Sequence, residues 1–159
     1  MTTNGSTQTD VTFVEVTAQP TLVVQFNFDQ REIGELMGAA LETVHDYLKT
    51  AQIQAIGPPF TRYLVWTDDQ KRAESGFPVE WAVEGGGLVV ASALPSGRVA
   101  RLVHTGPYSG LMEAKNQVLD AIRNRGLTPD GGPIEIYVTN PYEETNDTKY
   151  QTEIIWPIE

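Results

Sequence analysis

The sequence contains an internal repeat of about 75 residues, and this repeat constrains the fold more than any other feature. Three pairs of segments match in the same order, at offsets of 75, 74 and 73 residues: GELM (34–37) with SGLM (109–112), GPPFTRY (57–63) with GGPIEIY (131–137), and VEWAV (79–83) with TEIIW (152–156). Matches that keep their order with so little drift predict two copies of one supersecondary unit.

Hydrophobic periodicity predicts the order of elements within each copy. In the second copy a strand at 99–104 ends at a Gly-Pro turn, and Ser109 stands at the expected N-cap of a helix whose apolar residues run from 111 to 122. Gly126 is the expected helix stop. Two strands, at 134–139 and 152–158, complete this copy.

The first copy has the same pattern. Strands are expected at 21–28, 60–66 and 79–83, with a polar, solvated loop at 67–76 and a further strand at 88–95. Asp29 and Glu32 have the spacing of a capping box. One helical face is apolar throughout, and it consists of Ile33, Leu36, Met37, Ala40, Leu41, Val44, Tyr47 and Leu48.

These elements predict an α+β fold of two pseudo-symmetric strand-helix-strand-strand repeats, which form antiparallel sheets around a central ligand cleft. Residues 1–10 are small and polar, and we expect a disordered tail there. Residues 11–159 are expected to form a single domain, with repeat one at about 11–87 and repeat two at about 88–159. Residues 11–16 predict an edge strand, because Pro20 follows closely.

Composition narrows the class of function. The formal net charge is −10, which disfavours direct contact with nucleic acid. The chain has no cysteine and no apolar run near 18 residues, so we expect a cytoplasmic protein without a membrane span. Neither histidine, His45 or His104, has a carboxylate at metal-ligand spacing, and we expect His104 to be structural. The glycine-rich segments lack the features of nucleotide-binding loops, so we expect neither a metal nor a cofactor.

The candidate ligand-binding residues are aromatic and acidic. The sharpest is Glu153, because strand alternation places it on one face with Ile155 and Pro157, and a carboxylate among apolar side chains needs a partner. Glu80 matches Glu153 in the repeat and is a weaker candidate. The remaining candidates are the aromatic residues of the closing strands and turn, each of which could also belong to the core: Phe60, Tyr63, Trp66, Trp81, Tyr108, Tyr137 and Trp156.

Several segments resemble the GyrI-like, or bacterial transcription-activator effector-binding, superfamily. They are HTGPYSGL (104–111), GGPIEIYVTNP (131–141) and YQTEIIWPI (150–158), together with GPPFTRYL (57–64) and FPVEWAV (77–83) in the first copy. The resemblance covers nearly the whole chain. It implies two strand-helix-strand-strand units around a cleft. Trp156-Pro157 stands where the family more often has Tyr-x-Pro.

The resemblance also implies residue roles. In multidrug-sensing regulators of this superfamily, a glutamate of the last strand and nearby aromatics hold lipophilic cations, and Glu153 matches that place. In its hydrolases of cyclopropane-bearing genotoxins, a carboxylate and an aromatic hydroxyl assist attack by water, and Tyr137 matches that tyrosine. The sequence shows no attached DNA-binding domain, so we expect a stand-alone protein.

Three functions stay open from sequence. The first is a cytoplasmic protein that binds a lipophilic, possibly cationic small molecule through aromatic contacts, with Glu153 as counter-charge. The second is a hydrolase of reactive electrophiles, in which Glu153 activates water and Tyr137 donates a proton as catalytic residues. The third is a gyrase-inhibitor-like module that binds a protein partner. Whether the chain is an enzyme, and its oligomeric state, are left open.

Overall fold

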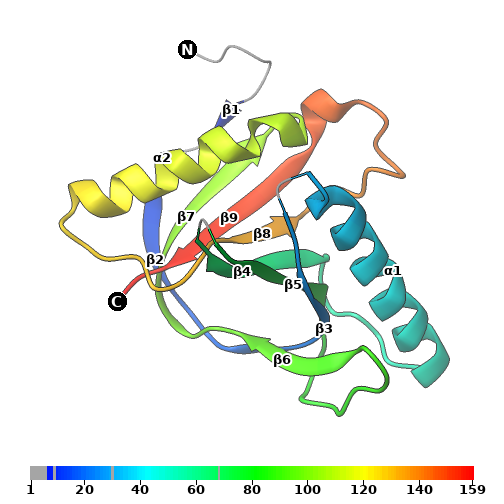
Figure 1. Cartoon of the computed structure of the whole chain (residues 1–159). Helices are drawn as coiled ribbons and strands as arrows, with labels where there is room; N and C mark the ends of the chain where they lie inside the picture. Colours follow the sequence, from blue (N-terminus) through cyan, green and yellow to red (C-terminus); the bar gives the residue numbers. More distant parts are fainter. Residues whose placement is uncertain (1–6, 9, 30, 68) are drawn as a thin grey trace. The chain divides into compact units, whose positions relative to one another are not determined.

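The computed structural model describes residues 7–8, 10–29, 31–67 and 69–159, except for the side chains of residues 7, 8 and 66. The chain divides into two compact units, unit 1 (Met1–Val16 and Gly97–Glu159) and unit 2 (Thr17–Ser96). The elements are β1 (Thr7–Gln8), β2 (Thr12–Val16), β3 (Gln19–Asn27), α1 (Ile33–Ala51), β4 (Phe60–Trp66), β5 (Lys71–Pro78), β6 (Val90–Leu94), β7 (Gly97–Thr105), η1 (Tyr108–Gly110), α2 (Leu111–Asn124), β8 (Ile134–Tyr137), η2 (Asp147–Lys149) and β9 (Gln151–Pro157) (Figure 1). The predicted α+β class and antiparallel pairing are confirmed.

Unit 2 is an antiparallel sheet in the order β4-β5-β3-β6 with α1 on one face (Figure 1). The predicted apolar face of α1 is confirmed, because Ala40, Val44 and Leu48 are buried at intervals of four residues. Val44 and Leu48 pack with Leu22 of β3 in the core of the unit. Leu22 and its alternate neighbours along β3 therefore face α1, and the intervening residues face away from it.

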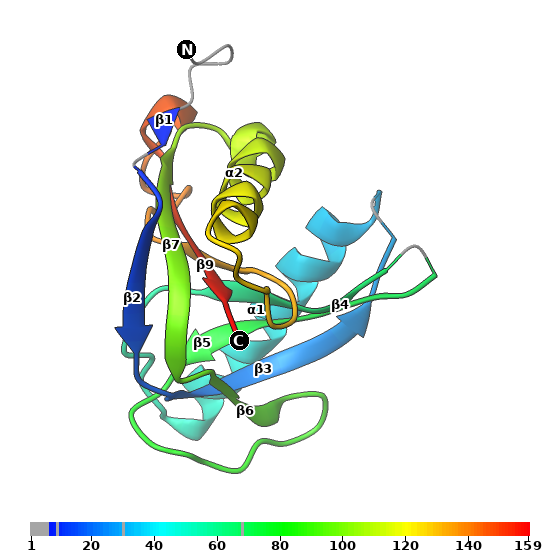
Figure 2. The same ribbon diagram turned by 90° about the vertical axis from the view of Figure 1, so that its left-hand side faces the viewer.

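Unit 1 pairs β9 with both β7 and β8, and β7 with β1 and β2 (Figure 2). Helix α2 packs on the sheet through Ala114, Val118 and Ile122, which form one core with Leu102 of β7 and Ile154 of β9. Two cations hold β2 in place, because the guanidinium carbons of Arg125 and Arg98 lie 4.1 and 5.6 Å from the ring centroid of Phe13.

Two predicted helix starts differ in detail. Asp29 Oδ1 accepts hydrogen bonds from the backbone N–H groups of Arg31 and Glu32, at 2.9 and 3.1 Å, so Asp29 caps the turn before α1. The prediction of Ser109 as an N-cap is wrong. Ser109 lies inside η1, and α2 begins at Leu111 without a side-chain cap, because the tight η1 turn supplies its entry.

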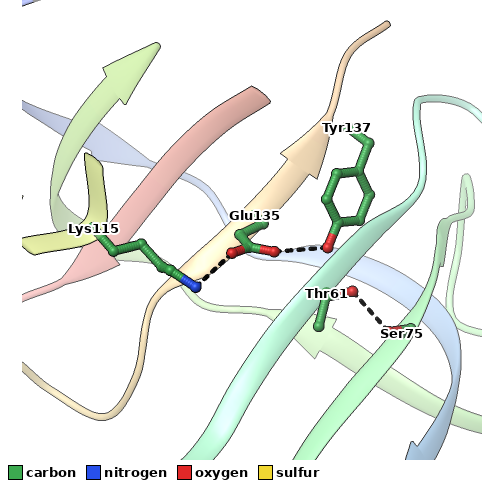
Figure 3. A network of polar contacts seen from close by, with 5 residues as sticks. All are labelled: Thr61, Ser75, Lys115, Glu135 and Tyr137. Carbon is green, nitrogen blue, oxygen red and sulfur yellow. Dashed lines mark hydrogen bonds and ion pairs between the residues drawn. The ribbon is translucent and has the colours of Figure 1, made fainter. Parts of the chain in front are cut away.

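The predicted loop at 67–76 and strand at 79–83 are wrong, because β5 occupies residues 71–78. The strand escaped detection because its buried residues are polar and are satisfied inside the unit. Ser75 Oγ lies 2.8 Å from Thr61 Oγ1 (Figure 3), and Glu74 accepts hydrogen bonds from Gln25 Nε2 at 3.0 Å and Ser92 Oγ at 2.9 Å. Alternation of apolar and polar residues is therefore lost, although the strand is central.

The expected boundary between repeats also differs from the observed units. β2 pairs with β7 and belongs to unit 1, whereas β6 pairs with β3 and belongs to unit 2. Each four-element repeat thus gains an edge strand from the chain segment that precedes the other repeat. Of the expected tail, residues 1–6 and 9 lie outside the described residues, and β1 pairs with the end of β7.

We expect Gly76→Ala to destabilise the protein and Gly38→Ala to stabilise it. A Cβ at residue 76 would lie 1.9 Å from the carbonyl oxygen of Leu22, whereas a Cβ at residue 38 meets no other described atom within 4 Å. The first change should cost about 1–3 kcal/mol by overpacking, and the second should gain about 0.8–1 kcal/mol in helix propensity. Urea unfolding measures both, and an unchanged midpoint for Gly76→Ala would contradict the β3–β5 register.

Candidate functional site

Three tyrosine side chains of unit 1 meet and form what we call the tyrosine cluster: Tyr108, Tyr137 and Tyr150. The ring of Tyr108 lies edge-on to that of Tyr137, with centroids 5.9 Å apart, and 5.2 Å from that of Tyr150. Tyr137 ends β8, Tyr150 directly precedes β9, and Tyr108 begins η1 after the predicted Gly106-Pro107 turn. The cluster thus joins residues from three separate segments.

A buried ion pair adjoins the cluster. Glu135 Oε2 lies 2.7 Å from Lys115 Nζ, and Tyr137 OH donates a 2.8 Å hydrogen bond to Glu135 Oε1 (Figure 3). The side chains of Lys115 and Glu135 are only 10% and 3% exposed. Glu135 and Tyr137 are two residues apart on β8 and therefore share one face, and Lys115 belongs to the buried face of α2.

The environment of the cluster favours a neutral Tyr108. Burial raises the pKa of Tyr108 above its ordinary value of 10.0, and the nearby Tyr150 and Glu135 raise this pKa further. Both effects disfavour the tyrosinate anion. The Tyr108 hydroxyl is therefore a hydrogen-bond donor throughout the physiological range of pH.

A polar row continues from the cluster across the sheet. Thr152 of β9 lies opposite both Tyr137 of β8 and His104 of β7, so the three share the face that carries α2. His104 is buried, with Nε2 3.0 Å from the Pro107 carbonyl oxygen, which fits the expected structural role. The buried Thr152 hydroxyl has no hydrogen-bond partner among the described residues, so it remains available to a polar atom.

Solvent reaches the cluster from the side of η1 and the β8–β9 connection. Tyr108 is 40% exposed despite its two ring contacts. Met112, one helical turn further, and Val138, next to Tyr137, are also exposed large hydrophobic residues. Aromatic and thioether groups that stay in water next to a buried polar network provide the combination that lipophilic ligands use.

Glu153, the sharpest sequence candidate, does not join this cluster. In the β8–β9 ladder Glu153 lies opposite Ile136, whereas Tyr137 lies opposite Thr152. Glu153 and Tyr137 therefore point to opposite faces of the unit 1 sheet and cannot share a pocket on one face. The Glu153 carboxylate pairs with Arg101 Nε of β7, so its partner is an arginine of the same sheet.

Two further candidates have roles in packing. Trp156 packs against the core beneath α2, and its indole N–H donates a 3.0 Å hydrogen bond to the carbonyl of Gly131. Tyr63 is buried against Phe28 and α1 in unit 2, with ring centroids 6.0 Å apart. Phe60 is buried on the opposite face of the same strand, so Phe60 and Tyr63 do not line one site.

The remaining candidates lie at or beyond the strand ends of unit 2. Glu80 and Trp81 follow β5 and are exposed, and the side chain of Trp66 lies outside the described residues. The proposed match of Glu80 with Glu153 is wrong. By ladder position the counterpart of Glu153 is Glu74, because both precede a Phe-Pro or Trp-Pro pair by three residues and both lie opposite β4 or β8 in the central strand.

Sequence reasoning missed Glu135, Lys115 and Tyr150. The signal for two of them was present. Glu135 alternates with Ile134 and Ile136 and so shares the face of Tyr137, and Lys115 interrupts the apolar stripe of its helix. These are charged residues inside apolar faces, the same signal that singled out Glu153. Nothing in the sequence pattern indicated that Tyr150 would meet Tyr108.

Other possible sites carry less chemistry. A hollow beside α2 contains none of the candidate residues and is lined by Val11, Glu113, Asn116, Gln117, Asp120, Ala121 and Asn124. Across the described ranges, no three His, Asp or Glu side chains are placed to hold a metal ion. Neither of the two helices described is long and apolar enough to cross a membrane.

Comparisons with solved structures show the fold. The crystal structure of the EcmrR C-terminal domain is 17% identical, with a TM-score of 0.81 over 94% of this chain and 97% of that one. SAV2435 bound to tetraphenylphosphonium is 12% identical, with a TM-score of 0.69 over 95% and 94% of the two chains. A hydrolase from Listeria innocua is 14% identical, with a TM-score of 0.60 over 94% and 91%.

This chain spans 57% of the length of the EcmrR chain seen in its complex with DNA. A search of curated proteins found no match. Residues 9–159 match the family described as the GyrI-like small molecule binding domain. The protein therefore belongs to the GyrI-like small-molecule binding domain family, as the resemblance of its sequence segments indicated.

Proposed function

We propose that this chain is a cytoplasmic binding protein for a lipophilic, aromatic small molecule, and that the ligand binds at the tyrosine cluster. The observation that carries the proposal is the contact of Tyr108 with both Tyr137 and Tyr150 beside the buried Glu135. Aromatic faces bind flat apolar groups, and a few fixed polar atoms orient them. SAV2435, a structural neighbour, binds tetraphenylphosphonium, whose surface consists of phenyl rings.

The fixed polar atoms around the cluster support specificity as well as affinity. The Tyr108 and Thr152 hydroxyls can each contact a polar atom of a ligand, since the first is a neutral donor and the second has no described partner. The ion pair holds the Tyr137 ring in one orientation through its hydroxyl. A preorganised ring costs little side-chain entropy when a ligand packs against it.

The hydrolase alternative depended on Glu153 and Tyr137 acting on one molecule. Because they point to opposite faces, this pair gives the alternative no support. The inhibitory-module alternative has no specific surface in the described residues that favours it. Binding without turnover is therefore the function that the site supports best.

We expect Tyr150→Leu and Tyr108→Leu to weaken binding of triphenylphosphine oxide, a neutral triaryl probe, by on the order of tenfold each. Each change removes an aromatic face but keeps an apolar side chain. Tyr142→Leu is the matched control, since Tyr142 is 94% exposed. Calorimetric titration gives the affinities. Equal losses in all three variants, or none in the first two, would place the ligand elsewhere.

Stability should depend on Tyr108 at alkaline pH. The folded-state pKa is raised above the unfolded value near 10.0, so this contribution is fully present below pH 10 and is lost as pH rises through the folded-state pKa. We expect the melting temperature to fall less between pH 9 and 11 in Tyr108→Phe than in the wild type. Parallel curves for the two proteins in circular dichroism melts would mean that burial of the phenol has been misjudged.

Ligand should be recovered unchanged. We expect an electrophilic cyclopropane-bearing aromatic compound, incubated with excess protein, to show the same rate of loss as in buffer alone, because no activated carboxylate faces the tyrosine cluster apart from the lysine-bound Glu135. Chromatography before and after incubation measures the loss. Accelerated hydrolysis that Glu135→Gln abolishes would instead support an enzyme.

A further inference from the structure

The lysine beside the tyrosine cluster determines which ligands the site accepts. We propose that Lys115 is a built-in counter-ion that makes the site select uncharged aromatic ligands over lipophilic cations. This inference rests on the proposed binding at the tyrosine cluster and specifies the class of ligand. It replaces the cationic ligand expected from sequence, for which a free carboxylate would be required.

The charge balance of the site supports this selection. Lys115 Nζ lies 2.7 Å from Glu135 Oε2, and Tyr137 OH donates to Oε1, so both carboxylate oxygens already bind a donor. The pair is almost fully buried, and its net charge is zero. A ligand cation would lose its hydration on entry and would meet no net negative charge, while the Lys115 ammonium repels it.

The second acidic residue of the unit offers no substitute. Glu153 lies on the opposite face of the sheet, and Arg101 already supplies its positive partner. Tyr108 is neutral at physiological pH because its pKa is raised. A cation at the tyrosine cluster would therefore depend on Glu135 alone, and Lys115 holds that residue.

The first repeat shows that the strand-helix-strand-strand unit does not require this ion pair. At the offsets of 75 and 74 residues, Ala40 stands for Lys115, Thr61 for Glu135 and Tyr63 for Tyr137. In unit 2 the Thr61 hydroxyl contacts Ser75 at 2.8 Å, and Ala40 is buried in α1 (Figure 3). Two neutral residues thus satisfy the fold at the same places, so the two charges in unit 1 call for a separate role.

The test compares two probes that share three phenyl rings, the neutral triphenylphosphine oxide and the cationic methyltriphenylphosphonium. In the wild type we expect the oxide to bind more tightly. Lys115→Met leaves Glu135 without its cation, and should raise phosphonium affinity on the order of 10- to 100-fold at pH 8. Lys115→Arg retains the charge and should preserve the wild-type preference.

Charge reversal around the pair provides the control. Glu135→Gln leaves the lysine charge unbalanced and should weaken phosphonium binding below that of the wild type. Adding Lys115→Met to Glu135→Gln should then restore it, which keeps the test valid should Lys115→Met alone prevent folding. An oxide-to-phosphonium ratio within about twofold of the wild type in Lys115→Met, or in the double variant relative to Glu135→Gln, overturns the inference.

The outcomes also separate this inference from the proposed function. Binding of both probes that Tyr150→Leu weakens, with a ratio insensitive to Lys115, would keep the site and reject the counter-ion. Failure of both probes to bind the wild type and all variants would overturn the proposed site and the inference together. Tighter binding of the phosphonium than of the oxide by the wild type would also reject the counter-ion.

Discussion

The last strand of each repeat lies in the middle of its sheet, and the rest of the architecture depends on that placement. β5 pairs with β4 and β3, and β9 pairs with β8 and β7. A strand that is hydrogen-bonded on both edges fixes the register of its neighbours, and a shift of one residue would turn every side chain to the other face. The ladder of β9 thereby separates Glu153 from Tyr137, and brings Tyr137 into line with Thr152 and His104.

The two repeats use equivalent positions for different chemistry. In unit 2 the helix-facing side of β4 carries hydroxyls that satisfy one another, and Tyr63 packs into the core with Phe28. In unit 1 the corresponding side of β8 carries a carboxylate that needs a lysine, and its tyrosine borders two more aromatic rings. A buried ion pair is weak evidence for stability, since apolar replacements often do as well. Its presence in one repeat alone is better explained by what that repeat binds.

Periodicity predicted both helices, the bounds of β4, and the approximate positions of β3, β7, β8 and β9, because those elements bury apolar side chains at regular spacing. It failed for β5, whose buried Glu74 and Ser75 are satisfied by hydrogen bonds that no local pattern encodes. The Tyr108–Tyr137 contact joined two predicted candidates. The face shared by Glu135 and Tyr137 followed from alternation, whereas the approach of Tyr150 depended on the path of the β8–β9 connection, which composition alone does not define.

The discontinuity of unit 1 has a consequence for synthesis on the ribosome. Unit 2 is one continuous segment, so all its strands are available once Ser96 has been made. β2 is made long before its partner β7 and must wait unpaired while unit 2 is completed, with Phe13 lacking the two arginines that later cover its ring. Contacts distant in sequence form late. We therefore expect unit 2 to fold first during translation, and the binding half of the protein to be completed only when the C-terminal strand β9 has emerged.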